Sequence, residues 1–359
     1  SDTFINQGEV SSQLYDLMAK IGEFFKQTET IYKLINNNKD IVQAIPHFRD
    51  LEKIVTCSDE LSYQMQAFIK DIKFFNDLPN IGRARSCYAS FLAIKDQFVR
   101  LLKAIGELDA LVSVAHLITK DGTNSCCYTE FIDAEYPYLE LNNVWNPLIT
   151  AITQEKESIS FGDEKIAVCP NMLLSGPHGS GKSSFMREVA YSVITSQLFG
   201  VAFADSCRMT YFSVINTYFT VVDSIVEGKS TFMVSQELMD TIENRILNLK
   251  DKRYGLTLID EPLRDTFEEE ASGLIIKFGE SIAPVTENIC ILATHYTAPI
   301  DTLELGYGDR FKNYHMKIEE RTKGRFRRLF KLAEGKASWW FTDDAQRDRY
   351  IRWLHTAAS

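Results

Sequence analysis

A glycine-rich motif of the form G-x-x-x-x-G-K-S lies near the middle of the chain and comprises Gly176, Pro177, His178, Gly179, Ser180, Gly181, Lys182 and Ser183, followed by Ser184. An apolar run precedes it at 167–174, and a stretch with helical character follows at 185–196. A glycine-rich turn of this kind, between a strand and the start of a helix, binds phosphate because its backbone N–H groups and the helix dipole face the anion. We expect Lys182 to reach the β- and γ-phosphates and the Ser183 hydroxyl to ligate Mg²⁺. The motif predicts a nucleoside triphosphate site, and a glycine turn that binds nothing is the alternative.

Two adjacent carboxylates follow a second apolar run. Residues 255–259 read as a buried strand, and Asp260 and Glu261 end it. Two acids in this position are also common at helix starts. Together with the phosphate motif, they favour Asp260 as a Mg²⁺ ligand, often through its water, and Glu261 as the general base that polarises the attacking water.

Two further segments are compatible with a nucleotide site. His295 ends an apolar run, and it is either a core or capping histidine or a contact to the γ-phosphate. The segment Gly228-Lys229-Ser230-Thr231 precedes a long predicted helix that ends near residue 250. Ser230 is a natural N-cap, but a helix start of this kind also binds anions.

Composition excludes some classes of protein. The 359 residues are 45% hydrophobic and 25% charged, which is ordinary for a soluble globular protein. No apolar run is long enough to cross a bilayer, and seven cysteines without a C-x-x-C pair suit a reducing setting, so we expect a cytoplasmic protein without membrane partners. The net charge is −6 over residues 1–150, −10 over 151–310 and +6 over 311–359. Only the C-terminal part has the basic character of a nucleic-acid surface.

The spacing and length of the apolar runs predict two domains and a C-terminal tail. Residues 1–126 carry apolar residues at helical spacing and read as an all-α domain, with its clearest break at 76–86. Residues 127–342 read as an α/β domain with a mostly parallel sheet, and residues 343–359 as a helical tail. The expected strands are 138–141, 167–174, 209–212, 255–259 and 289–293, followed by an antiparallel hairpin of 314–319 and 325–332.

The order of these motifs resembles the ATPase domain of the MutS mismatch-repair family, a branch of the ABC-type ATPases. The resemblance covers about residues 138–342 and is carried by residues 171–177, 189–199, 223–233, 258–261, 293–296 and 334–338. More weakly, residues 48–54 and 107–111 resemble the start and end of that family's helical core and lever domain. The implied fold is an ABC-type P-loop NTPase domain with a mixed, mostly parallel sheet, preceded by the all-α domain.

The resemblance implies ATP and Mg²⁺ as cofactors, with Lys182, Glu261 and His295 as catalytic residues. In that family two ATPase domains face each other, so Ser230 and Thr231 would contact the γ-phosphate bound to the opposite subunit. Hydrolysis would then require a homodimer or a heterodimer with a paralogue. A side chain before the first strand packs on adenine in such proteins, and either Ile159 or Phe161 lies in the right place.

Four departures from the family pattern bear on function. No mismatch-reading domain precedes the helices in these 359 residues, and the two core segments lie close together where the family has long levers and a DNA clamp. The family's Gly-Arg-Gly-Thr is Leu263-Arg264-Asp265-Thr266 here, and the family's glutamine near Asp205 is missing. Two functions stay open: an ATP-dependent DNA-binding protein, or an ATP-driven dimerisation switch that acts on a protein partner. A metabolic kinase is a third, less favoured reading.

Overall fold

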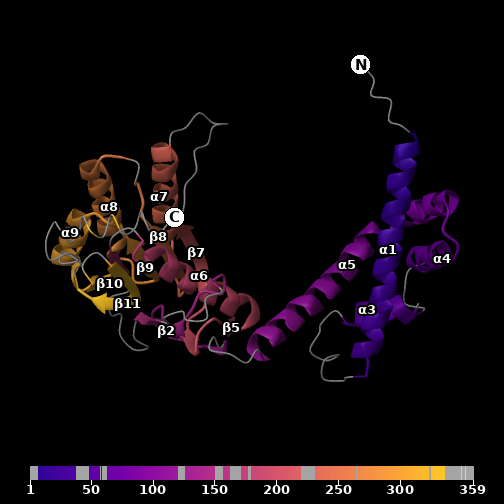
Figure 1. The fold of residues 1–359 in the computed structure, drawn as a ribbon, viewed down its shortest axis with the longest axis horizontal. Coiled ribbons are helices and arrows are strands. Elements are labelled where there is room, and N and C mark those ends of the chain that lie inside the picture. The colour runs from indigo at the N-terminus through magenta and orange to yellow at the C-terminus, as the bar shows by residue number, and fades with distance from the viewer. Residues whose placement is uncertain are drawn as a thin grey trace, which may run out of the picture. The chain divides into compact units, whose positions relative to one another are not determined.

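The computed structural model divides into two units, residues 1–116 and 117–359 (Figure 1). The domain bounds expected after residues 126 and 342 stay predictions. The structure describes residues 7–37, 48–56, 58, 63–119, 126–149, 157–161, 171–176, 179–219, 231–263, 266–322, 325–335, 349 and 352. Of the expected C-terminal helical tail, Arg349 and Arg352 are helical, and the rest of 343–359 lies outside the described residues.

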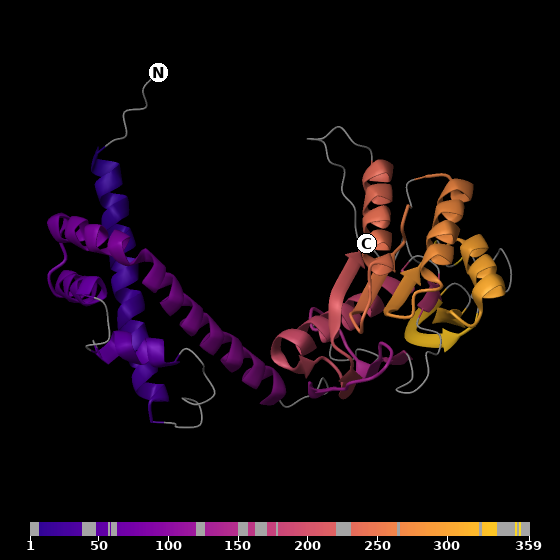
Figure 2. The ribbon, with the colours of Figure 1, turned by 180° about the vertical axis from the view of Figure 1, so that it is seen from behind.

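The first unit is helical in its described part, as its apolar spacing predicts. Its helices are α1 (Gln7–Ile35), α3 (Phe48–Thr56), α4 (Tyr63–Asp77) and α5 (Ile81–Thr119), and Figure 2 shows α5 in purple as the longest of them. Apolar side chains three and four residues apart share one helix face and pack into a common core. That core includes Met18, Phe25, Leu51, Phe68, Ile72, Ile94 and Leu101.

The break inside the helical unit is narrower than the predicted 76–86. It covers only residues 78–80, between the end of α4 and the start of α5. Asn80 caps the new helix, since its Oδ1 accepts a hydrogen bond from the Arg83 N–H at 3.0 Å. Pro79 precedes this cap and cannot continue α4. The residues after it are therefore helical despite Gly82 in the first turn.

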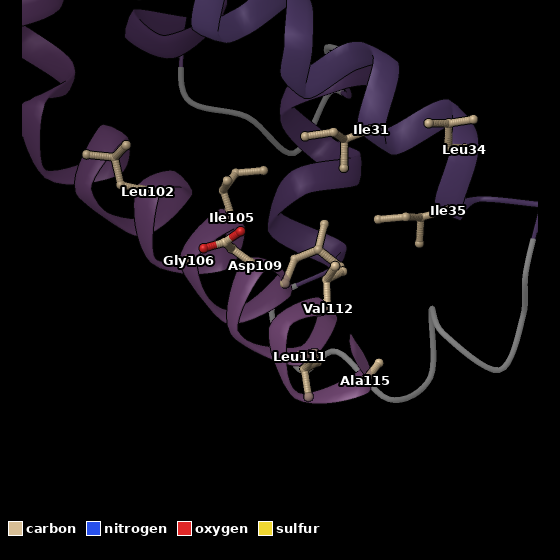
Figure 3. Close-up of a pocket in the computed structure, with 11 residues that line it drawn as sticks. Ile31, Leu34, Ile35, Leu102, Ile105, Gly106, Asp109, Leu111, Val112 and Ala115 are labelled. Atoms are coloured by element: carbon tan, nitrogen blue, oxygen red, sulfur yellow. The ribbon is translucent and has the colours of Figure 1, made fainter. Parts of the chain in front are cut away.

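An apolar pocket of about 790 Å³ opens between α1 and α5 of the first unit (Figure 3). Ile31 and Ile35 line it from α1, and Leu102, Ile105 and Val112 line it from α5. Among the described residues, none that is predicted to bind nucleotide lines it.

The second unit contains two sheets. The larger has the strand order β11-β10-β4-β9-β8-β7. Four of its five pairings are parallel, and β10 and β11 form an antiparallel hairpin. Its strands are β4 (Asn171–Ser175), β7 (Phe212–Tyr218), β8 (Tyr254–Asp260), β9 (Asn288–Ala293), β10 (Phe311–Thr322) and β11 (Arg325–Glu334). The smaller sheet has the order β3-β2-β6-β1-β5. Its strands are β1 (Cys127–Phe131), β2 (Leu139–Val144), β3 (Glu157–Phe161), β5 (Val201–Ala202) and β6 (Ser206–Met209).

Helices cover both faces of the larger sheet. They are α6 (Lys182–Phe199), α7 (Thr231–Leu247), α8 (Glu268–Ile282) and α9 (Thr297–Tyr307). Successive residues of β4 face opposite sides, so Leu174 packs in one core cluster with Phe185 of α6, and Leu173 packs in another with Ile275 of α8. The central strands β8 and β9 are buried throughout, which explains their continuous apolar runs.

Two expectations about the strands need correction. The expected strand 209–212 is the end of β6 and the start of β7, which belong to different sheets. Between these two strands, the backbone N–H of Thr210 donates a hydrogen bond to the Tyr138 carbonyl oxygen at 2.9 Å. The short strands β1, β3 and β5 were not predicted, because their burial patterns are brief or irregular. The predicted hairpin is confirmed and extends to Phe311–Thr322 and Arg325–Glu334.

Candidate nucleotide-binding site

The phosphate motif joins the end of β4 to the start of α6, as predicted. Gly176, Gly179 and Gly181 have φ values of 153°, 74° and 110°, a region that favours glycine. A Cβ atom on Gly176 would lie 2.6 Å from the Ser180 Oγ atom, so the loop has no room for a larger residue there. Pro177 and His178 lie outside the described residues. The N-terminus of α6 follows this turn, where helix N–H groups favour an anion.

Lys182 is the first residue of α6 and is 3% exposed. Its Nζ atom donates a hydrogen bond to the Gly176 carbonyl oxygen at 2.6 Å. The same atom lies 3.0 Å from Glu261 Oε1, in an ion pair between the phosphate motif and the end of β8. The structure therefore brings together two residues that were predicted to share a site, although 79 residues separate them along the chain.

Asp260 lies beside this pair and is also buried, at 7% exposure. Burial raises the pKa of its carboxyl group, and the nearby Glu261 charge raises it further. A hydrogen bond with Ser183 and the charges of Lys182 and Arg187 lower the same pKa in part. Asp260 Oδ1 has no hydrogen-bond partner among the described residues. A buried carboxylate oxygen beside a hydroxyl is a ligand set that suits Mg²⁺.

Glu261 occupies a left-handed backbone conformation with φ of 47°. Its backbone N–H donates to the Ala293 carbonyl oxygen at 2.9 Å, which ties the end of β8 to the end of β9. Leu263 also has a positive φ of 59°, and its N–H lies 3.5 Å from the Tyr218 hydroxyl. Positive φ is uncommon for residues other than glycine and often marks a functional turn.

His295 lies at the same edge of the sheet. It follows β9, whose neighbours are β4 and β8, and the Thr294 N–H donates to the Leu174 carbonyl oxygen at 3.0 Å. The His295 ring is half-buried and packs on the Tyr296 ring, with centroids 4.2 Å apart. The carboxyl ends of three neighbouring parallel strands thus carry the phosphate loop, the carboxylates and the histidine, which is where α/β sheets bind ligands.

Comparison with known proteins relates this arrangement to one family. Residues 172–342 match the family model of MutS domain V. The chain is 28% identical over 254 residues to the DNA mismatch repair protein Msh3 of Dictyostelium discoideum, which covers 67% of this chain and 17% of that protein. It is 30% identical over 243 residues to the DNA mismatch repair protein MutS of Streptococcus uberis, covering 67% of this chain and 27% of that protein. These matches support the MutS family.

The match to MutS domain V includes every described residue of the site. It begins in β4 and extends beyond β11, so it contains Lys182, Asp260, Glu261 and His295. The probable DNA mismatch repair protein Msh6 of Drosophila melanogaster gives a similar picture, with 30% identity over 66% of this chain and 20% of that protein. The chain spans well under a third of the length of these MutS and Msh relatives.

The remaining predicted contacts are those of Ser230, Thr231, Ile159 and Phe161. Ser230 is outside them, and Thr231 is described only as the first residue of α7. Ile159 and Phe161 are 5% and 4% exposed and pack in the core cluster that contains Leu139 and Leu141. Neither side chain has an open face for a base in this structure, and the contact with adenine stays a prediction.

Two side chains near the site were not predicted from sequence. Arg187 contributes positive charge beside Asp260, and it lies four residues after Ser183, on the same face of α6. That spacing was a signal that could have identified it. Tyr218 ends β7 and reaches the turn after Glu261 through its hydroxyl. No local pattern pointed to Tyr218, because its role depends on the pairing of β7 with β8.

None of the described helices is long and apolar enough to span a membrane.

Proposed function

We propose that this chain is a MutS-type ATPase that binds and hydrolyses Mg²⁺-bound ATP at a dimer interface, in transactions of the DNA mismatch-repair type. The observation that carries the proposal is the convergence of Lys182, Ser183, Asp260 and Glu261 beneath one glycine-rich loop. The match of residues 172–342 to MutS domain V supports the same function.

Binding of the triphosphate rests on the loop and on Lys182. The backbone N–H groups of residues 179–183 surround the β-phosphate, and the dipole of α6 adds a favourable field. Lys182 carries its positive charge into a site where it is almost fully buried. Water screens a charge weakly in such a position, so the ammonium group binds phosphate oxygens strongly.

Mg²⁺ fits the residues beside the loop. Asp260 offers a buried carboxylate oxygen without a described partner, and Ser183 offers its hydroxyl. When bound, Mg²⁺ would supply neutralisation of the charge on the phosphate oxygens. Burial opposes ionisation of Asp260, so a cation at this position would relieve an unfavourable charge.

Hydrolysis requires a base and a group that detects the γ-phosphate. Glu261 accepts a proton from the attacking water, and Lys182 stabilises the charge on the phosphate oxygens. His295 contacts the γ-phosphate from the end of β9. We assign Ser230 and Thr231 to the γ-phosphate of the opposite subunit in a homodimer, or in a heterodimer with a paralogue.

The two possible functions differ in the molecule on which the ATPase acts. In the first function this molecule is DNA, and in the second it is a protein. The names of the relatives favour DNA, since all three are mismatch repair proteins. The charge favours a protein partner, because residues 1–150 and 151–310 carry net charges of −6 and −10. A surface that grips DNA is normally basic. In this second reading, ATP drives dimerisation and the dimer acts on its partner without DNA.

The test measures DNA binding by the fluorescence anisotropy of a labelled duplex, at low and moderate salt and with and without ATP. A proposal that includes DNA predicts binding at low salt that weakens steeply as salt rises, because counterions compete for the phosphates. If the duplex shows no binding even at low salt while ATP is still hydrolysed, the function is the protein-directed switch.

A further inference from the structure

We infer that Glu261 competes with the nucleotide for Lys182, so that a triphosphate must displace the Glu261 carboxylate before its phosphates can bind. The inference rests on the proposed function and concerns the regulation of the same site. Its starting point is the ion pair between Lys182 Nζ and Glu261 Oε1, at 3.0 Å. A general base that is held by the phosphate-binding lysine is positioned to control entry to the site.

The ammonium group of Lys182 makes polar contacts with two groups of the protein itself. Lys182 Nζ donates to the Gly176 carbonyl oxygen at 2.6 Å and contacts Glu261 at 3.0 Å. The two side chains are 3% and 15% exposed. Because little water reaches the pair, the attraction between its charges is stronger than at an open surface. A phosphate group that approaches Lys182 therefore replaces a carboxylate rather than water.

The backbone at Glu261 is held in place by its neighbours. Glu261 adopts a φ of 47°, and its N–H is held by the Ala293 carbonyl oxygen at 2.9 Å. The next turn is held as well, since the Leu263 N–H lies 3.5 Å from the Tyr218 hydroxyl. The surrounding structure maintains a backbone conformation that a residue with a Cβ atom rarely adopts. The backbone position from which the Glu261 side chain extends is thus held by β8, β9 and β7 together.

The neighbouring carboxylate makes a different contact. Asp260 is hydrogen-bonded to Ser183, whereas Glu261 Oε1 lies 3.0 Å from Lys182 Nζ. The two acids at the end of β8 therefore have separate partners. Removal of Glu261 from Lys182 leaves the contact between Asp260 and Ser183 in place. The competition concerns the lysine and leaves the proposed Mg²⁺ ligands unchanged.

The consequence for binding follows from a two-state equilibrium. When only a fraction of molecules has a free Lys182, the apparent affinity falls by that fraction. Breaking the pair by mutation makes every molecule competent. We expect the mutation to raise the association rate of the nucleotide, because the ion pair between Lys182 and Glu261 otherwise has to break before the nucleotide binds.

Two substitutions separate this competition from charge repulsion. Glu261→Gln removes the charge, and Glu261→Asp keeps the charge but shortens the side chain by about 1.5 Å. We would measure association and dissociation rates of a fluorescent non-hydrolysable ATP analogue by stopped flow, with thermal unfolding as the check of folding. We expect both variants to bind about five- to tenfold more tightly than wild type, through faster association.

Each other outcome overturns the inference. If Glu261→Asp binds like wild type and only Glu261→Gln binds more tightly, charge repulsion explains the effect and the pair does not compete. If all three proteins bind with equal constants, the inference is wrong while the proposed nucleotide site stands. If none of the three shows saturable binding, the proposed function itself fails.

Discussion

The ammonium group of Lys182 contacts the Gly176 carbonyl oxygen at 2.6 Å and Glu261 Oε1 at 3.0 Å. We expect Lys182→Ala to weaken ATP binding by about 30- to 150-fold, because a hydrogen bond to a charged group contributes about 2 to 3 kcal/mol. Titration of a fluorescent ATP analogue measures this loss. Lys252→Ala is the matched control, since Lys252 is 60% exposed and pairs with Asp133 at 3.4 Å. Equal losses in both variants would contradict the assignment of Lys182.

Asp260 makes stability depend on pH. Its pKa in the folded protein is raised above the usual aspartate value, chiefly by burial. The folded state therefore binds this proton more tightly than the unfolded state, and the free energy of unfolding falls as pH rises through the interval between the two pKa values. We expect Asp260→Asn to lose this part of the pH dependence, as measured by urea unfolding at several pH values. If the free energy of unfolding depends on pH in the same way in wild type and in Asp260→Asn, Asp260 is not the source of this pH dependence.

At the residue scale, the sequence indicated that certain residues come together, but it did not indicate how they contact one another. The motif and the acids after 255–259 correctly indicated that Lys182 and Glu261 belong near one another. The ion pair itself depends on a φ of 47° at Glu261 and on a hydrogen bond to Ala293, neither of which has a local sequence signal. The burial of Ile159 and Phe161 depends likewise on the pairing of β3 with β2.

At the scale of elements, α8 offers a matched pair of glycines. A Cβ atom on Gly279 would lie 2.5 Å from Leu303 Cδ1 of α9, and Leu303 is fully buried. We expect Gly279→Ala to destabilise the protein by about 1 to 3 kcal/mol, because the well-packed contact between α8 and α9 cannot accommodate a methyl group. The lower end of that range already allows for the gain in helix propensity.

The control for this change is Gly273→Ala in the same helix. Gly273 is exposed, and no atom lies within 4 Å of a Cβ placed there. We expect this substitution to stabilise the protein by about 0.5 to 1 kcal/mol through helix propensity alone. Urea unfolding midpoints compare the two variants with wild type. A stabilising Gly279→Ala would mean that α8 and α9 do not pack as described.

Elements with long periodic patterns were predictable, and short ones were not. Helices α5 and α6 and strands β8 and β9 carry continuous apolar patterns that fix their type. Strand β5 has only two residues, and its place depends on pairing with β1. The expected strand 209–212 was wrong because its two halves join different sheets, and the choice between sheets is a tertiary contact.

At the scale of the whole molecule, the proposed function requires two copies. The site residues that are described in one chain are proposed to bind and position the triphosphate. The contact from Ser230 and Thr231 is proposed to come from the opposite copy. We expect Glu261→Gln to accumulate as an ATP-bound dimer, because the base is lost while the phosphate contacts remain. Size-exclusion chromatography with ATP and Mg²⁺ follows this dimer, and Lys182→Ala is the control that should stay monomeric.

The most direct test of the account is the molar mass of the wild-type protein by sedimentation equilibrium, with a saturating non-hydrolysable ATP analogue and Mg²⁺. The chain has a mass of 41.0 kDa, and the account predicts a doubling of that mass when the analogue binds. A protein that binds the analogue to saturation and keeps the mass of a single chain would contradict it.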